Sequence, residues 1–208
     1  MSKISLALFD KAESFSNKAE AEAKSHGESV EKSYYPNRVD LTHLPFCTID
    51  PVDAKDFDDA IYFDVHTTTL YVAIADVTSY VFEMGNIDKE AKERGFSIYF
   101  PHKAIPMLPR ALSENICSLK PNVDRLAYTF KITLDPFTCK PIKEELFESI
   151  IHSHRRYTYE RIDLFLSKKA SASDAVDQTI LDYLLPLNAL TQKLRDMRLQ
   201  NSFSFRSS

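Results

Sequence analysis

The chain has 208 residues, with 26 Lys and Arg against 30 Asp and Glu, and its formal net charge is −4. This length is enough for one sizeable domain with a hydrophobic core. The negative charge argues mildly against a nucleic-acid-binding protein, because phosphate contacts favour a basic surface. With only three glycines, neither a P-loop nor a dinucleotide fingerprint can form, which excludes nucleoside-triphosphate and NAD chemistry.

The start of the chain, MSKISLALFDKAESF, is not typical of a signal peptide, and no apolar run in the sequence is long enough to span a membrane. We therefore predict a cytoplasmic protein without a membrane partner. Cys47, Cys117 and Cys139 are far apart and in no metal-ligand spacing, which predicts buried, reduced thiols. His152 and His154 fall in a predicted strand as solvated or core histidines, so a zinc site is disfavoured.

A helix is predicted over residues 4–26, where Ala, Glu and Lys dominate and Gly27 is a natural stop. Its apolar positions thin out after Phe15, so we expect it to lie on the surface. A polar connector containing Pro36 follows. Helix and connector together make up an N-terminal segment of residues 1–39.

The middle of the chain alternates strands with turns. Asn86 is a possible N-cap of a short helix over 87–94, with Gly95 beyond its end, and three prolines between Pro101 and Pro109 predict an irregular segment. Apolar patterning predicts strands at 46–49, 61–63, 70–76, 126–134 and 142–153, with turns at 66–69 and 136–140.

The last third of the sequence is predicted to be helical. One candidate helix covers 159–166, and a long amphipathic helix begins at Asp174 and continues to Met197, with a kink expected at Pro186. A polar tail, NSFSFRSS, ends the chain.

The segment TIDPVDAKDFDDA holds five carboxylates within ten positions, Asp50, Asp53, Asp56, Asp58 and Asp59. Crowded like charges repel one another, and a divalent cation compensates them. Magnesium prefers oxygen ligands, uses one or two carboxylates and leaves room for water and a substrate phosphate. The pattern therefore indicates a magnesium site for a reaction at a phosphodiester.

Two other interpretations of this acidic segment compete with a magnesium site. A solvated acidic loop is the ordinary one, but these acids lie between two apolar strands, which favours a fixed target for them. An EF-hand fails, because the segment has no central Gly and no closing Glu.

The segment DLTHLPFCTIDPVDAKDFDDAIYF closely resembles the signature of the ribonuclease II and ribonuclease R family, the RNB exoribonucleases. The resemblance continues in order through LYVAIADVTSYV, the IDKEAKERG to TFKITLD stretch and HSHRRYTYERI, covers residues 40 to about 165, and is looser through the last helix. It implies an α/β fold, a mixed sheet with helices packed on it. Residues 40–208 would be the N-terminal portion of such a catalytic domain.

The resemblance also implies a reaction, the Mg²⁺-dependent 3′–5′ degradation of single-stranded RNA to nucleoside 5′-monophosphates. Asp50, Asp56, Asp58 and Asp59 fall on the four acids of the motif and would form the metal site. Asp50 and Asp59 would be ligands, Asp58 is the acid tied most closely to the chemical step, and Asp56 supports the cation. Asp53 has no matching role and is interpreted as surface charge.

Two aromatic residues also correspond to family positions. Tyr99 falls where the family stacks a ring on RNA near its 3′ end, and Tyr159 falls where a tyrosine lines the catalytic cavity. Stacking on a ring tolerates any base sequence. Without the resemblance, both would be interpreted as core residues.

The chain departs from the family pattern at its end. The family's domain is much longer and continues to an Arg motif and a distant Glu, and OB-type RNA-binding barrels flank it; none of these is present, and RLQNSFSFRSS follows the last helix. We therefore expect a truncated catalytic domain with weak RNA affinity, whose missing C-terminal half is a candidate partner. The alternative is a catalytically inactive fragment that at most binds metal or RNA weakly. A metal-binding interaction domain without a link to RNA is a third interpretation.

Overall fold

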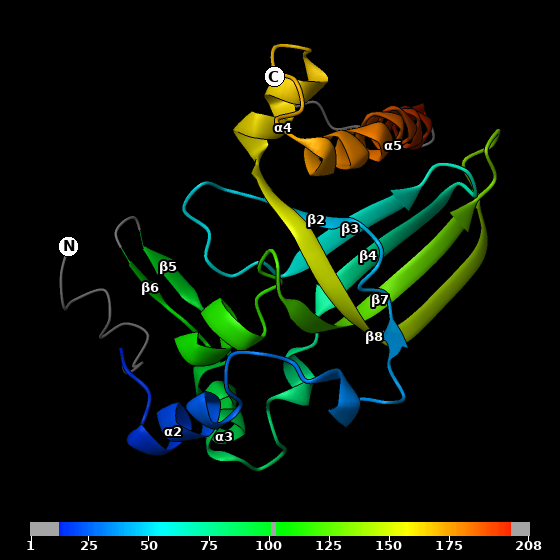
Figure 1. Ribbon diagram of the computed structural model, residues 1–208. Coiled ribbons are helices and arrows are strands. Elements are labelled where there is room, and N and C mark those ends of the chain that lie inside the picture. Colours follow the sequence, from blue (N-terminus) through cyan, green and yellow to red (C-terminus); the bar gives the residue numbers. More distant parts are fainter. Residues whose placement is uncertain (1–12, 101–102, 201–208) are drawn as a thin grey trace.

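The computed structural model describes residues 13–100 and 103–200 (Figure 1). Its strands are β1 (Val39–Asp40), β2 (Phe46–Asp50), β3 (Asp59–Asp64), β4 (Thr69–Ala75), β5 (Ile98–Phe100), β6 (Lys103–Ile105), β7 (Asp124–Leu134) and β8 (Pro141–Thr158). Its helices are α2 (Asn17–Ser25), α3 (Asn86–Arg94), α4 (Tyr159–Leu166) and α5 (Ala175–Gln200). Three short helical turns join them, η1 (Lys32–Tyr34), η2 (Val77–Ser79) and η3 (Leu112–Ile116).

Strand β8 gives the main sheet its shape. The six strands have the order β1-β8-β2-β3-β4-β7, and β8 pairs with β7 as well. Its first part is antiparallel to β7 and the part from Ser153 to Thr158 is parallel to β2. The sheet therefore curls into a closed circuit of β2, β3, β4, β7 and β8, a mixed sheet that confirms the predicted α/β class.

The inside of this circuit combines three buried alanines with larger apolar side chains. Ala60, Ala73 and Ala127 are buried there on β3, β4 and β7, beside Phe46 of β2 and Ile151 of β8. A tightly curled sheet leaves little interior volume, so alanine at the central positions allows the strands to approach one another.

The outside of β2 and β3 is covered by α4 and α5 (Figure 1). Cys47 and Phe63 point to this side and pack with Ile180 and Leu184 of α5. Tyr183 also ties α5 to the sheet, because its hydroxyl donates to the carbonyl of Pro45, just before β2, at 2.8 Å. The amphipathic pattern predicted from Asp174 thus forms one continuous helix, with Pro186 inside it.

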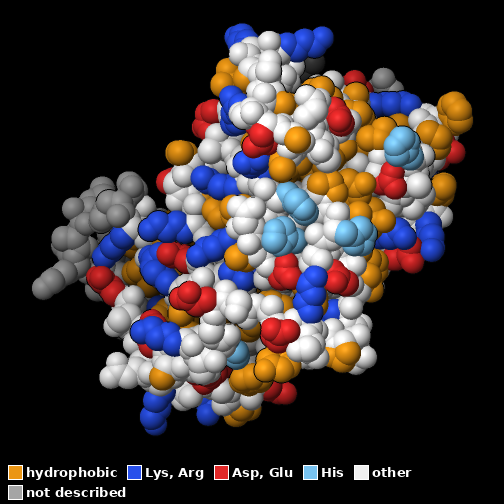
Figure 2. Space-filling model, viewed as in Figure 1, with side chains coloured by type: hydrophobic (Ala, Val, Ile, Leu, Met, Phe, Trp, Pro, Cys, Tyr) orange, Lys and Arg blue, Asp and Glu red, His pale blue; other side chains and the backbone are white. Residues whose placement is uncertain are grey.

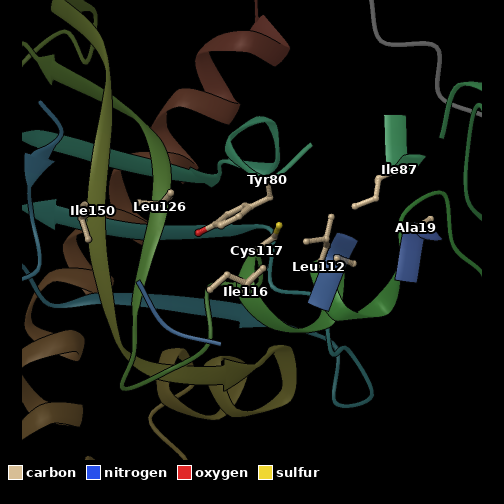
Figure 3. Close-up of a cluster of buried hydrophobic side chains, with 9 residues drawn as sticks. Ala19, Tyr80, Ile87, Leu112, Ile116, Cys117, Leu126 and Ile150 are labelled. Atoms are coloured by element: carbon tan, nitrogen blue, oxygen red, sulfur yellow. The ribbon is translucent and has the colours of Figure 1, made fainter. Parts of the chain in front are cut away.

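A third cluster attaches the N-terminal segment to the sheet. Figure 3 shows Tyr80 pointing toward Leu126 of β7, with Leu112 and Ile116 of η3 beside it. The cluster continues to Ala19 and Ala23 of α2, which packs on α3. The buried side chains of α2 are the small Ala19 and Ala23, and Glu22 accepts hydrogen bonds from Asn86 of α3, which explains how a helix with so few large apolar residues is held.

Several local predictions need correction. Ser16 is the N-cap of α2, so residues 13–16 are not helical, and residues 4–12 and the tail 201–208 lie outside the described residues. Gly85, not Asn86, caps α3, because the Asn86 side chain donates to Glu22 instead. The tight turn after β3 lies at residues 65–68, and β8 is longer than predicted. The division at residues 39 and 40 stays a prediction.

The proline-rich segment is also more regular than predicted. Ile98, Tyr99 and Phe100 of β5 pair with Ile105, Ala104 and Lys103 of β6 in a small antiparallel hairpin. The flanking prolines do not disrupt it, because Pro106 and Pro109 follow β6. Pro101 lies outside the described residues.

Other predictions concern cysteines and helices. Cys47, Cys117 and Cys139 are buried and free, as predicted. Burial raises the pKa of the Cys47 and Cys117 thiols to about 12, which makes them unreactive at neutral pH. Within residues 13–100 and 103–200, no helix has both the length and the apolar character that crossing a bilayer requires.

The crowded interior of the closed circuit makes the first prediction. Replacing Ala127 by Leu adds three heavy atoms to a fully buried position and should lower the free energy of unfolding by about 1–3 kcal/mol. The exposed Ala189 of α5 provides the control, because Ala189→Leu should leave stability within about 0.5 kcal/mol. Denaturant unfolding of both variants measures this, and equal effects would show that the interior has room to spare.

Candidate functional site

The acidic loop crosses one end of the closed circuit. Strand β2 ends at Asp50 and β3 begins at Asp59, and the two strands are antiparallel neighbours. The connecting residues 51–58 must therefore turn at this end. All five carboxylates of the sequence motif lie on this turn or at the strand ends beside it.

Asp50 is the most enclosed of these acids. Its side chain lies on the inner side of β2 with Phe46 and Thr48, and the residue is 9% exposed. Its Oδ2 atom is buried and has no hydrogen-bond partner among the described residues. Burial and the negative charges of Asp59 and Asp58 raise the pKa of Asp50, while the charge of Arg156 opposes the shift. A buried carboxylate of this kind is stabilised by a cation.

Asp56 and Asp58 face a pocket of about 940 Å³. The surrounding protein atoms, and then the charges of Asp56 and Asp59, raise the pKa of Asp58. The acids therefore interact with one another across the turn, as the sequence predicted. This mutual repulsion is the electrostatic cost that a bound divalent ion would offset.

The pocket also brings in residues from distant parts of the chain. Tyr99 of β5 lines it and is 74% exposed, so its ring is available to a ligand. Positive side chains stand among the acids of this pocket, namely Lys55, Lys103 and Arg110. Figure 2 shows Lys and Arg gathered over the area where Figure 1 places β5, β6 and the acidic loop.

Not every predicted site residue lines the pocket. Asp50 and Asp59 adjoin it from the strand ends, whereas Asp53, Asp56, Asp58 and Tyr99 line it. Tyr159 is 54% exposed at the start of α4, outside the lining. It follows Thr158, whose Cα pairs with that of Asp50 in the sheet, so Tyr159 is one residue beyond the partner of the buried acid.

The donor chemistry fits a hard divalent ion. Carboxylate oxygens are the only charged acceptors here, and the buried Oδ2 of Asp50 has no other partner among the described residues. In the same described part of the chain, no three His, Cys, Asp or Glu side chains converge closely enough to hold a metal together. Magnesium is accommodated by one or two carboxylates with water completing its shell, so a pair of these acids such as Asp50 and Asp59, whose charges act on one another, is a sufficient ligand set.

Two residues outside the acidic motif hold its loop. The Oγ of Ser118, which is fully buried, accepts from the backbone N–H of Phe57 at 3.0 Å and donates to the carbonyl of Lys55 at 3.1 Å. The Nη2 of Arg156 donates to the carbonyls of Pro51 at 2.5 Å and Val52 at 3.1 Å. Sequence patterns could not identify these residues, because Ser118 lies 61 positions from Phe57 and Arg156 is 105 from Pro51.

Comparison with known proteins shows the family and the fold. The family model described as RNB domain matches residues 38–208. The chain belongs to the RNB-domain family. It is 40% identical over 205 residues to Ribonuclease R of Helicobacter pylori (strain ATCC 700392 / 26695), and this match covers 98% of the chain and 30% of the relative. The chain thus spans about a third of the length of this curated relative.

Solved structures give the same RNB-domain fold. Mycoplasma genitalium RNase R in complex with ribose methylated single-stranded RNA superimposes with a TM-score of 0.83 at 34% identity, over 93% of this chain and 30% of that one. Yeast Ssd1, a pseudonuclease, has a TM-score of 0.60 at 21% identity, over 73% of this chain and 19% of that one. The latter shows a shared fold alone.

The buried contact of Ser118 in this RNB-type domain makes a second prediction. Ser118→Ala leaves the buried N–H of Phe57 without its acceptor and should lower the free energy of unfolding by about 1–3 kcal/mol. Ser25 bonds a carbonyl at the exposed end of α2, so Ser25→Ala should change stability by less than about 0.5 kcal/mol. Thermal or denaturant unfolding decides this, and an unaltered Ser118→Ala protein would contradict the assigned bonds.

Proposed function

We propose that this chain carries the N-terminal portion of a Mg²⁺-dependent 3′–5′ exoribonuclease domain. Its substrate is single-stranded RNA and its products are nucleoside 5′-monophosphates. One observation carries the proposal: Asp56, Asp58 and Tyr99 line a single pocket that Asp50 adjoins, in a chain of the RNB-domain family. The resemblance to a Mycoplasma genitalium RNase R bound to single-stranded RNA supports it.

Each acid has an assigned task in this proposal. Asp50 and Asp59 hold the cation from the two strand ends, and Asp56 supports it from the loop. Asp58, which faces the pocket with a raised pKa, is the acid in contact with the reacting phosphate and its water. When bound, Mg²⁺ supplies the charge that polarises a phosphoryl oxygen and activates water.

In this proposal, aromatic rings stack on the RNA bases and positively charged side chains contact the phosphates. Tyr99 offers an exposed ring in the pocket, and Tyr159 offers a second one beside Asp50. Lys103 and Arg110 stand at the same pocket and neutralise phosphates there. Four acids and three bases line this pocket, and Lys103 and Arg110 are paired with Glu13 and Glu114. These bases therefore supply individual phosphate contacts and do not reverse the net charge of −4, and a bound cation adds the remaining positive charge.

The C-terminal half of an RNB-type catalytic domain is the proposed protein partner. Phe130 and Leu146 pair across β7 and β8 on the face of the sheet that α5 covers elsewhere, and they are 45% and 57% exposed. Adjacent apolar side chains left exposed on a sheet typically mark a contact surface. Because the chain spans 30% of the Helicobacter pylori relative, we assign this surface to the C-terminal half of an RNB-type domain. We propose a cytoplasmic location.

The alternative proposal is a catalytically inactive fragment that binds metal or RNA weakly. The RNB-type fold of yeast Ssd1, a pseudonuclease, supports the view that this architecture does not require turnover. Measurement of binding and turnover on the same purified chain separates the two proposals. Mg²⁺-dependent RNA binding without release of mononucleotides favours the inactive fragment, and steady release excludes it.

Substitution of Asp58 tests the assigned chemistry. Asp58→Asn keeps the shape of the side chain but removes its charge, so release of mononucleotides from single-stranded RNA with Mg²⁺ should fall about 100-fold or more. Asp196→Asn removes the same charge from an exposed position of α5, outside the pocket lining, and should keep activity within about threefold. Equal activity of the wild type and Asp58→Asn would refute the assignment.

Stacking on Tyr99 makes a separate prediction about binding. On the Asp58→Asn background, which prevents cleavage, Tyr99→Ala should weaken binding of a labelled single-stranded RNA by about 1–3 kcal/mol. Tyr34 is also exposed, at 79%, but lies on η1 away from the pocket lining, so Tyr34→Ala is the control. Fluorescence anisotropy gives both affinities, and equal losses in the two variants would rule out a specific stacking role.

A further inference from the structure

Arg156 lies in β8 directly beside the acidic strand end. Its Cα pairs with that of Thr48 in β2, and two positions further along Thr158 pairs with Asp50. Strand β2 ends at Asp50 and the chain enters the loop at Pro51. The guanidinium of Arg156 reaches across this exit and donates to the carbonyls of Pro51 and Val52. It therefore fixes the direction in which the chain leaves Asp50.

The same guanidinium also reaches the far end of the loop. Its central carbon lies 5.1 Å from the centroid of the Phe57 ring, which is a cation–π distance. Phe57 is 7% exposed, and its backbone is fixed by Ser118 and by Leu119, whose N–H donates to the Phe57 carbonyl at 2.8 Å. One planar side chain thus contacts both ends of a loop that presents Asp53 and Asp56 between them.

The neighbouring arginine shows that this arrangement is specific. Arg155 points to the other side of β8 and forms ion pairs with Asp174 and Asp177 at the start of α5. Within the described residues, Arg156 forms no ion pair with a carboxylate and directs its Nη2 donor to backbone carbonyls. Its charge nevertheless acts on Asp50 and opposes the effect of Asp58 and Asp59 on that group.

We propose that Arg156 is a positioning residue of the acidic site: it holds the loop of residues 51–57 at both ends, so that Asp50 and Asp58 are presented together to a divalent cation. This assignment rests on the proposed function for the identity of the ligand. It predicts a preference for arginine, because an ammonium group cannot bond two carbonyls and lie on a ring in one plane. Lysine at this position should restore the site only in part.

Two measurements test the role of Arg156 without any assay of turnover. The first is hydrogen exchange in the metal-free protein at the backbone amides of Ala54 and Phe57, which donate to Pro51 and Ser118. The second is calorimetric titration with Mg²⁺ alone. Both are applied to the wild type, Arg156→Met, Arg156→Lys and the matched control Arg155→Met, together with denaturant unfolding of each protein.

In Arg156→Met, both loop amides should exchange faster and Mg²⁺ affinity should fall about 10- to 100-fold, as for other residues that orient metal ligands. Arg156→Lys should lie between this variant and the wild type. Arg155→Met should lose stability through its broken ion pairs, yet keep loop exchange and Mg²⁺ affinity within about twofold.

Unchanged loop exchange or unchanged Mg²⁺ affinity in Arg156→Met would overturn the proposal, as would equal losses in Arg155→Met. Absence of RNA cleavage by the wild type, with the expected exchange and affinity results, would leave Arg156 assigned and would contradict the proposed function instead.

Discussion

The pairing of β8 with two different strands is the constraint on which the rest of the structure depends. Its first part pairs antiparallel with β7, and its last residues, from Ser153 to Thr158, pair parallel with β2. This second pairing closes the circuit of strands and places Thr158 opposite Asp50. It also determines that Arg156 lies above the exit of β2 and that α4 begins beside the acidic loop. The acids stay together on the connection between the neighbouring strands β2 and β3 in any case, but without the pairing of β8 with β2 Arg156 would not lie beside them.

The closed circuit forces negative charges into a small space. Asp50 is nearly buried, and its pKa and that of Asp58 are raised by burial and by the other acids. In the absence of a cation this repulsion opposes folding, because the ionised acids are less stable here than in the unfolded chain. The loop is held nonetheless by contacts that carry no negative charge, those of Ser118, Leu119 and Arg156. The scaffold therefore maintains an arrangement that its own charges disfavour, as is common where function requires it.

Much of this architecture follows from local sequence. The alternation of Tyr128, Phe130 and Ile132 with threonine and lysine predicted β7, and Gly95 predicted the end of α3, where it adopts a φ of +72°. The density of aspartate between two apolar strands predicted where the acids gather. These features depend on residues a few positions apart, and local patterns are most informative about such features.

The remaining features depend on distant residues. The pairing of β8 with β2 places Arg155 opposite Cys47, and the local sequence around either residue gives no indication of this pairing. The β5–β6 hairpin was missed because nearby prolines indicate irregular structure, whereas the residues that pair in it, 98–100 and 103–105, include no proline. Tyr99 was identified only by the resemblance to the family, because no local pattern marks it, and the structure places it at the pocket. The contacts of Arg156 and Ser118 with the loop became visible only in three dimensions.

We propose that the closed end of the strand circuit binds one divalent cation through its acids, and calorimetric titration of Mg²⁺ into the wild type, Asp50→Asn and Asp196→Asn measures this binding. We expect one bound ion in the wild type, an affinity at least about 10-fold weaker in Asp50→Asn, and little change in Asp196→Asn, whose carboxylate is exposed on α5. Binding that is equally strong in Asp50→Asn, or no binding to the wild type, would contradict it.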